Sequence, residues 1–164
     1  MAEFFNQFAD IFRAMPFWVY IILIIPAVLI TLSILGRINN AHRVNRVIRS
    51  AEVFETAEAF EERRKNQPSI SGVKDFPGCY ILSNAKTGKE YVGQSVHVLL
   101  RVHSHLAGSG NHMVHFAILK GNTFSIRVMP LEGSGFKNLN KMEKALIKKR
   151  GTYKRGYNRT RGNN

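Results

Sequence analysis

The sequence predicts an α+β protein: a small antiparallel sheet of three strands flanked by helices, preceded by a transmembrane helix and a helical stalk. Three observations lead to this prediction. The chain of 164 residues starts with a long uncharged apolar run and continues with a polar stretch rich in Ala, Glu and Arg. It then alternates strand-like and helix-like segments in the order ββααβα. The length suits one ordinary domain plus an accessory segment.

Residues 1–36 are predicted to form an N-terminal segment and a membrane-spanning helix. No residue between Arg13 and Arg37 is charged, and residues 17–35 are almost wholly apolar. As a helix this run would span about 28 Å, close to the hydrocarbon thickness of a bilayer. Pro26 is compatible, because membrane helices tolerate a proline kink. The rival readings are a buried core helix and a signal peptide, which would need a basic start and a small-residue cleavage site.

The charges that flank this run predict its orientation. Only Arg13 precedes it closely, whereas four arginines follow it: Arg37, Arg43, Arg46 and Arg49. The positive-inside rule then places the C-terminal part in the cytoplasm of a single-pass protein of the cell inner membrane. Cys79 is the only cysteine, which excludes an intrachain disulfide and fits a reducing compartment.

Residues 37–65 are expected to form a helical juxtamembrane stalk, and residues 66–72 a linker, since Pro68 and Gly72 break the helix. The stalk carries a narrow apolar stripe at spacings of three and four residues: Val44, Val47, Ile48, Ala51 and Phe54. This stripe can pair two protomers as a homo-oligomer, or it can dock on the globular domain of the same chain. The pattern slightly favours a solvated stalk with some self-association.

Residues 73–164 are expected to form the globular domain. Its strands are predicted at 79–84, 90–94 and 122–129, and the turn at 86–89 joins the first two. Its helices are predicted at 96–107, 112–119 and 141–150, with Ser95 capping the first and Asn138 or Asn140 the last. The remaining tail, 152–164, is basic and expected to be irregular.

The positive charge is concentrated in this domain. Residues 1–72 carry a net charge of +1, whereas residues 73–164 carry +12. Such an asymmetry predicts a polyanionic partner, either nucleic acid or an anionic membrane surface.

Two tyrosines of the predicted hairpin are expected to lie on the same face of the sheet. In a hairpin whose loop has an even number of residues, the numbers of two paired residues sum to an odd number, as 80 and 91 do. Side chains at two such positions then lie on the same face of the sheet. One same-face step in register would place Tyr80 and Tyr91 about 7–8 Å apart, close enough to share a ligand. An odd-length loop would separate them.

The first helix of the domain adds a cationic stripe. His97, Arg101 and His105 are spaced by four residues and therefore line up on one side. Arginine binds phosphate oxygens through its planar fork, so a phosphate ligand fits this stripe. An ordinary solvated helix face explains the spacing equally well.

Glu143 lies on a helix whose other charges are all basic. Its neighbours at three- and four-residue spacings are Leu139, Asn140, Leu146 and Ile147, so no helical ion pair explains it. Glu143 is therefore expected to face the core, where a carboxylate needs a partner. A single carboxylate can hold Mg²⁺ when phosphate and water complete the octahedron.

In this order, these residues resemble the GIY-YIG nuclease family. The resemblance covers residues 76–160, and apolar Cys79 and Val92 stand where the family has isoleucine. It rests on the two tripeptides, on polar residues that follow them and on a final asparagine: Gly78-Cys79-Tyr80, Tyr91-Val92-Gly93, Arg101, His105, His112, Glu143 and Asn158.

The resemblance implies a three-stranded antiparallel fold and cleavage of DNA phosphodiesters with one divalent metal, Mg²⁺ or Mn²⁺. Glu143 would hold the metal, Arg101 would stabilise the transition state, Tyr80 or Tyr91 would act as the base, and His105 would relay a proton. Gly93, His112 and Asn158 would support this site. Double-stranded DNA would contact cationic side chains: Lys89, Arg101, Lys148, Lys149, Arg155 and Arg159.

The leading hypothesis is a membrane-anchored DNA endonuclease of low sequence specificity. Phosphate contacts would supply most of its affinity. Tethering would confine it to foreign DNA that enters the cell, as in phage exclusion or defence, and a membrane protein at that site is a possible partner. The alternative is a membrane-tethered DNA-binding protein with little catalysis.

Overall fold

The computed structural model describes residues 2–66 and 75–163, and the chain divides into two compact units, residues 1–40 and 41–164. The first unit contains α1 (Ala2–Ala14) and the whole apolar run, residues 17–35, of α2 (Phe17–Arg49). Within α2, an 18-residue apolar window has no buried residue, and the helix is long and apolar enough to cross a membrane by length and composition alone.

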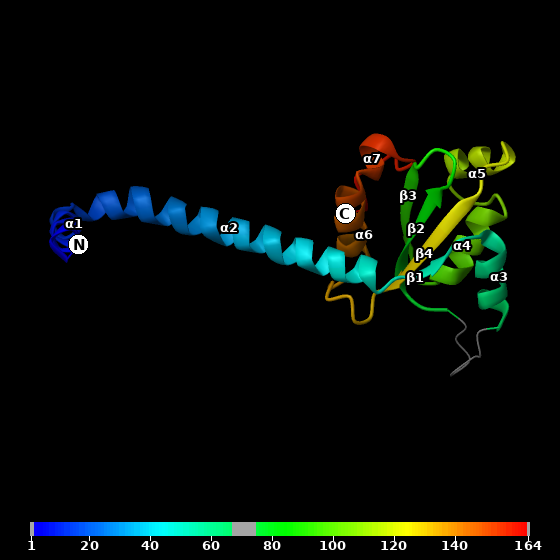
Figure 1. The fold of residues 1–164 in the computed structure, drawn as a ribbon, viewed down its shortest axis with the longest axis horizontal. Coiled ribbons are helices and arrows are strands. Elements are labelled where there is room, and N and C mark those ends of the chain that lie inside the picture. The colour runs from blue at the N-terminus through cyan, green and yellow to red at the C-terminus, as the bar shows by residue number, and fades with distance from the viewer. Residues whose placement is uncertain (1, 67–74, 164) are drawn as a thin grey trace. The chain divides into compact units, whose positions relative to one another are not determined.

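The second unit is built on a four-stranded antiparallel sheet with the order β1-β4-β2-β3 (Figure 1). Its strands are β1 (Glu52–Phe54), β2 (Gly78–Asn84), β3 (Glu90–Ser95) and β4 (Phe124–Pro130). The α+β class is confirmed, but the sheet has one strand more than the three predicted. The added strand, β1, lies at one edge and β3 at the other.

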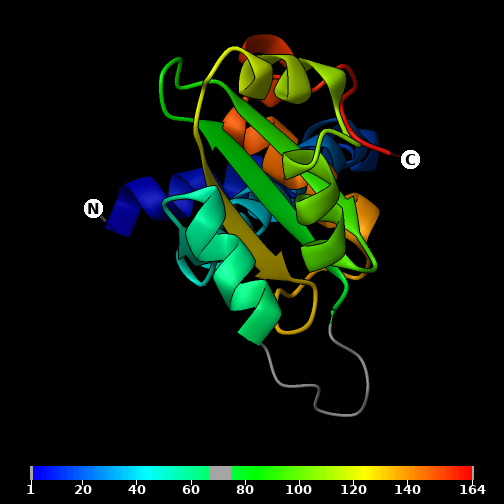
Figure 2. The ribbon, with the colours of Figure 1, turned by 90° about the vertical axis from the view of Figure 1, so that its right-hand side faces the viewer.

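Helices cover both faces of this sheet (Figures 1 and 2). One face carries α3 (Ala57–Asn66), α4 (Val98–Leu106) and α5 (His112–Leu119). The other carries α6 (Leu139–Arg150) and the last turns of α2, and the four-residue helix α7 (Thr152–Arg155) follows α6.

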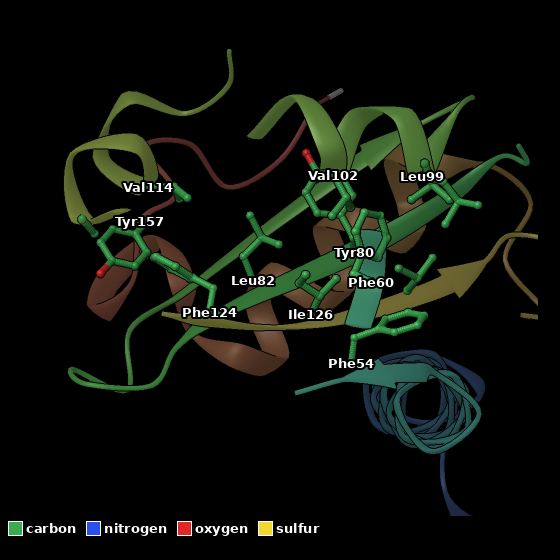
Figure 3. Close-up of a cluster of buried hydrophobic side chains, with 13 residues drawn as sticks. Phe54, Phe60, Tyr80, Leu82, Leu99, Val102, Val114, Phe124, Ile126 and Tyr157 are labelled. Atoms are coloured by element: carbon green, nitrogen blue, oxygen red, sulfur yellow. The ribbon is translucent and has the colours of Figure 1, made fainter. Parts of the chain in front are cut away.

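Strand β2 lies at the centre of two apolar cores. Tyr80 and Leu82 point into the core under α4 and α5, whereas Cys79 and Ile81 point into the core under α6. This alternation is the period-two geometry of a strand. Because both faces are covered, all four side chains are buried. Figure 3 shows the first core, in which Leu99 and Val102 of α4 lie beside Tyr80.

The prediction of a continuous helical stalk over 37–65 was wrong. The helix ends at Arg49, and β1 pairs with β4, with Phe54 opposite Ile126. Phe54 then packs edge-on against Phe60 of α3 at a ring-centroid distance of 5.4 Å. Burial of two aromatic rings in the core favours this break over continued helix.

The apolar stripe of α2 is used within the chain. Val44 and Val47 are each 2% exposed and belong to the core that contains Cys79 and Ile81. Of the two alternatives, docking on the same chain is therefore the one observed, and this stripe is not free to join two protomers. The globular unit also starts earlier than the predicted residue 73. The predicted linker, apart from Asn66, lies outside the described residues.

Helix α4 is capped differently from the prediction. Ser95 was expected at its N-cap, but the helix starts at Val98, and the Asp75 carboxylate accepts hydrogen bonds from the backbone N–H groups of Leu99 and Leu100 at 2.8 and 2.7 Å. A carboxylate there satisfies free helix N–H groups and complements the helix dipole. Asn138 caps α6 by accepting from the N–H of Lys141, as one of the two predicted alternatives.

Candidate active site

The two tyrosines share a face of the sheet. Tyr80 pairs with Gly93, and Leu82 pairs with Tyr91, so the tyrosines differ by one same-face step. Their ring centroids are 6.1 Å apart. Gly93 makes room for this arrangement, since a Cβ atom there would lie 2.3 Å from the hydroxyl oxygen of Tyr80. Glycine at the third position of Tyr91-Val92-Gly93 is therefore required sterically by the tyrosine on the neighbouring strand.

His105 is buried beside these tyrosines and does not extend the exposed cationic stripe expected from spacing. Its side chain is 1% exposed, and Nε2 lies 2.7 Å from the Tyr80 hydroxyl. The backbone N–H of Asn111 donates to Nδ1 at 3.1 Å. Since Nδ1 accepts, the neutral ring carries its proton on Nε2 and donates it to Tyr80. Burial, and after it the positive charge of the Arg101 guanidinium, together lower the pKa of His105 to about 4.

Arg101 lies on the exposed side of α4 and acts on both phenols. Burial raises the pKa of Tyr80, and the charge and hydrogen bond of Arg101 oppose that rise. Burial likewise raises the pKa of Tyr91, while Arg101 and a hydrogen bond from Tyr80 lower it. A guanidinium in this position stabilises negative charge on either phenol or on a nearby phosphate.

Glu143 reaches the same region from the opposite face of the sheet. It is 7% exposed, and its Oε2 atom accepts hydrogen bonds from Gln94 Nε2 at 3.0 Å and from the backbone N–H of Asn163 at 3.3 Å. Its charge also raises the pKa of Tyr91, after the larger effects of burial and Arg101. Glu143 can approach Tyr91 because β3 is an edge strand of the sheet. Tyr91 lies on one face of β3, and Gln94 and α6 lie on the other.

The surroundings of Glu143 suit a hard divalent cation that takes one protein ligand. Burial raises the pKa of the Glu143 carboxyl, opposed by its two hydrogen bonds. Within the described residues no lysine, arginine or histidine forms an ion pair with it, and no cluster of three His, Cys, Asp or Glu side chains exists. Mg²⁺ commonly binds through one or two carboxylates and completes its octahedron with water and substrate phosphate.

Asn158 holds the edge of the sheet next to the tyrosines. Its side-chain oxygen accepts from the N–H of Val92 at 2.9 Å, and its amide donates to the carbonyl of Val92 at 2.8 Å. The Asn158 amide thus pairs with both the N–H and the C=O of Val92, two backbone groups that the edge strand β3 would otherwise leave unpaired. His112 begins α5, and its Nε2 contacts the guanidinium of Arg159. Neither His112 nor Asn158 contacts the tyrosine hydroxyls in the hydrogen bonds of the described residues.

The cations predicted to contact DNA are all exposed. Lys89 precedes β3, while Lys149 and Arg155 come from α6 and α7, and the three line one pocket of about 580 Å³. Lys148 lines a second pocket of about 640 Å³ together with Arg155. The C-terminal end of α6 and the segment after it therefore present a strongly positive surface.

Several residues of the site were not predicted from the sequence. Gln94 directly follows Tyr91-Val92-Gly93. Alternation along the strand places it on the same face as Val92, and this was the sequence signal that could have identified it. Asn111 gives His105 its tautomer, and Gly110 makes room for the ring, because a Cβ atom there would lie 2.1 Å from Nδ1. Gly110 and Asn111 carry no periodic signal in the sequence. They lie in the turn between α4 and α5, and their partner, His105, lies on α4.

Comparison with known proteins gives one family match. The family model described as the GIY-YIG catalytic domain matches residues 76–158, half of the chain. This range contains the tyrosine pair, Arg101, His105, Glu143 and Asn158. The chain has no match among curated proteins or among solved structures.

Proposed function

The chain belongs to the GIY-YIG family, which indicates a nuclease-type hydrolase acting on DNA, and from this premise we propose that it is a membrane-anchored, metal-dependent DNA endonuclease. The observation that carries the proposal is the set of polar side chains that lie together on both sides of the edge strand β3. Two adjacent tyrosines, a buried neutral histidine and a guanidinium lie on one side, and a buried carboxylate lies on the other.

In this proposal one phenol of the tyrosine pair first releases its own proton to solvent, and the resulting phenolate, stabilised by the Arg101 guanidinium, then accepts the proton of the attacking water. The two phenols lie close together, with ring centroids 6.1 Å apart, and Arg101 opposes the rise that burial gives to the pKa of each. His105 fixes Tyr80 by donating from Nε2. Arg101 also neutralises charge that develops on the phosphate, since preorganised donors act strongly in a partly desolvated site. A general base of this kind contributes about 10²–10⁴ in rate.

Glu143 would hold the divalent metal, Mg²⁺ or Mn²⁺, through its carboxylate. When bound, the ion would polarise the scissile phosphate and stabilise the leaving oxygen. Asn158, Gly93 and His112 would support the site: Asn158 by pairing with Val92, Gly93 by admitting the Tyr80 ring, and His112 through its contact with Arg159.

Low sequence specificity is the second part of the proposal. Double-stranded DNA would be bound through phosphates by Lys89, Arg101, Lys149 and other exposed cations of a region that carries a net charge of +12. Phosphate contacts fix position and supply affinity without reading bases. Lys148, Arg155 and Arg159 extend this surface.

The test of catalysis is cleavage of supercoiled plasmid by the full-length protein in detergent, with Mg²⁺ or with a chelator. Glu143→Ala should abolish metal-dependent cleavage and leave DNA binding largely intact. Glu132→Ala is the matched control, because it removes an exposed carboxylate from the same domain. Cleavage by folded Glu143→Ala at the wild-type rate would remove Glu143 from the site. DNA binding without any cleavage by the wild type would favour a tethered DNA-binding protein.

The anchor supports a role against DNA entering the cell. α2 has the length and composition of a membrane span, and four arginines follow its apolar part, which favours a cytoplasmic nuclease domain at the inner membrane. A nuclease held there would meet incoming phage DNA, with a membrane protein at that site as its possible partner. Cells making the full chain should resist injected DNA, and cells making a chain without residues 1–36 at matched expression should not. Equal protection by the shortened chain would show that tethering is dispensable.

A further inference from the structure

Gln94 connects two oxygen atoms of α6. Its Nε2 atom donates to Asn140 Oδ1 at 2.7 Å and to Glu143 Oε2 at 3.0 Å. Asn140 and Glu143 are three residues apart on α6 and therefore lie on the same face of the helix. Gln94 stands at the end of β3, 49 positions before Glu143, so this contact ties the edge strand directly to the carboxylate.

The chemistry of this contact requires a donor. The side chain of residue 94 faces one amide oxygen and one carboxylate oxygen, and the amide NH2 of glutamine, which carries two donor hydrogens, can satisfy both. An apolar side chain would leave both oxygens without this partner, and a carboxylate would repel Glu143. The amide of Gln94 is neutral, so it orients Glu143 without cancelling its negative charge.

The hydrogen bonds fall unevenly on the two oxygens of Glu143. Oε2 accepts from Gln94 and from the N–H of Asn163, whereas no described residue donates to Oε1. With one oxygen held by two donors, rotation of the carboxylate would cost both hydrogen bonds. The remaining oxygen is therefore presented in a fixed direction.

From this geometry we propose that Gln94 is a positioning residue, which fixes the Glu143 carboxylate through Oε2 so that Oε1 is free to bind the divalent metal. The inference rests on the proposed nuclease function and deepens it, because it assigns an orienting partner to the candidate metal ligand. Partners that orient metal ligands by hydrogen bonds typically contribute about 10–100-fold to metal affinity or activity.

The test uses the full-length protein in detergent and two readouts. Mn²⁺ binding is measured without DNA by the loss of the free-ion electron paramagnetic resonance signal, and plasmid cleavage is measured as a function of Mg²⁺ concentration. Gln94→Met keeps the length of the side chain but removes the donor. It should bind Mn²⁺ about 10–100-fold more weakly and need correspondingly more Mg²⁺ for half-maximal cleavage. Cleavage at saturating Mg²⁺ should fall much less, because the residue acts on metal binding.

Asn122→Leu is the matched control, since it removes an amide from the loop before β4, at the other end of the sheet, and should leave both readouts unchanged. If Gln94→Met does not fold, Asn140→Leu provides a second variant. It leaves Gln94 in place but removes its other acceptor, and it should weaken Mn²⁺ binding in the same direction and to a smaller extent.

The outcomes separate this inference from the proposed function. Wild-type cleavage and Mn²⁺ binding, together with unchanged Mn²⁺ affinity in folded Gln94→Met, would overturn the positioning role alone. Absence of both Mn²⁺ binding and cleavage in the wild type would overturn the nuclease proposal, and the positioning role with it. A selective loss of metal affinity in Gln94→Met, with Asn122→Leu like the wild type, is the expected result.

Discussion

Replacing His105 by glutamine should make the folded domain less sensitive to acid. Glutamine can keep both hydrogen bonds of the neutral ring, because its oxygen can accept from the Asn111 N–H and its amide can donate to Tyr80. It cannot bind a proton. The wild-type ring is 1% exposed, and its burial, together with the nearby charge of Arg101, lowers the pKa of His105 from 6.5 to about 4.

The sign of the effect follows from proton linkage. Between pH 6.5 and about 4 the unfolded chain protonates His105 and the folded chain does not, so the folded state loses stability as pH falls through this window. Each unit of pKa difference corresponds to about 1.4 kcal/mol, which gives a loss on the order of 3 kcal/mol at the acid end. Above pH 6.5 the ring is neutral in both states and contributes no pH dependence.

The assay is urea unfolding of the full chain in detergent at several pH values, followed by the near-ultraviolet circular dichroism of the buried tyrosines. The difference in unfolding free energy between wild type and His105→Gln should grow in favour of the variant as pH falls from 6.5 to 4. His97→Gln, which removes an exposed histidine just before α4, should follow the wild type. A constant difference over this range would refute the assignment of His105 as a buried neutral ring.

Four further predictions concern the fold and DNA binding. Gly93→Ala should destabilise the domain by about 1–3 kcal/mol in urea unfolding, because its Cβ would overlap the Tyr80 hydroxyl, while Gly36→Ala, with nothing within 4 Å, should not. Asp75→Ala should cost about 1–2 kcal/mol in the same assay, since three backbone N–H groups lose their acceptor. The fragment 41–164 should fold, whereas 70–164 should lose cooperative unfolding because it lacks β1 and α3. Finally, if about 5 phosphates are neutralised, the log–log salt dependence of duplex binding should have a slope of about −4 to −5, and a flat response would contradict phosphate-based binding.

Local patterns in the sequence determined much of the chemistry of this protein. The parity of positions 80 and 91 placed two tyrosines on one face, because side chains alternate along every strand. The neighbours of Glu143 at helical spacing predicted that it faces the core, and it is 7% exposed. The uncharged run before Arg37 predicted a helix long enough to cross a membrane, as α2 is by length and composition. Each of these properties depends on spacing within one element.

The tertiary structure decided which elements meet. β1 has three residues, too few for a periodic signal, and it forms because β4, more than 70 positions later, offers an edge and a place for Phe54. The burial of His105 was equally invisible, since its helical spacing with Arg101 fits an exposed face until α4 is laid on the sheet. Gln94 finds Glu143 only because β3 is an edge strand and α6 packs beside it. In all three cases the deciding energy comes from partners distant in the chain, which periodicity and propensity do not encode.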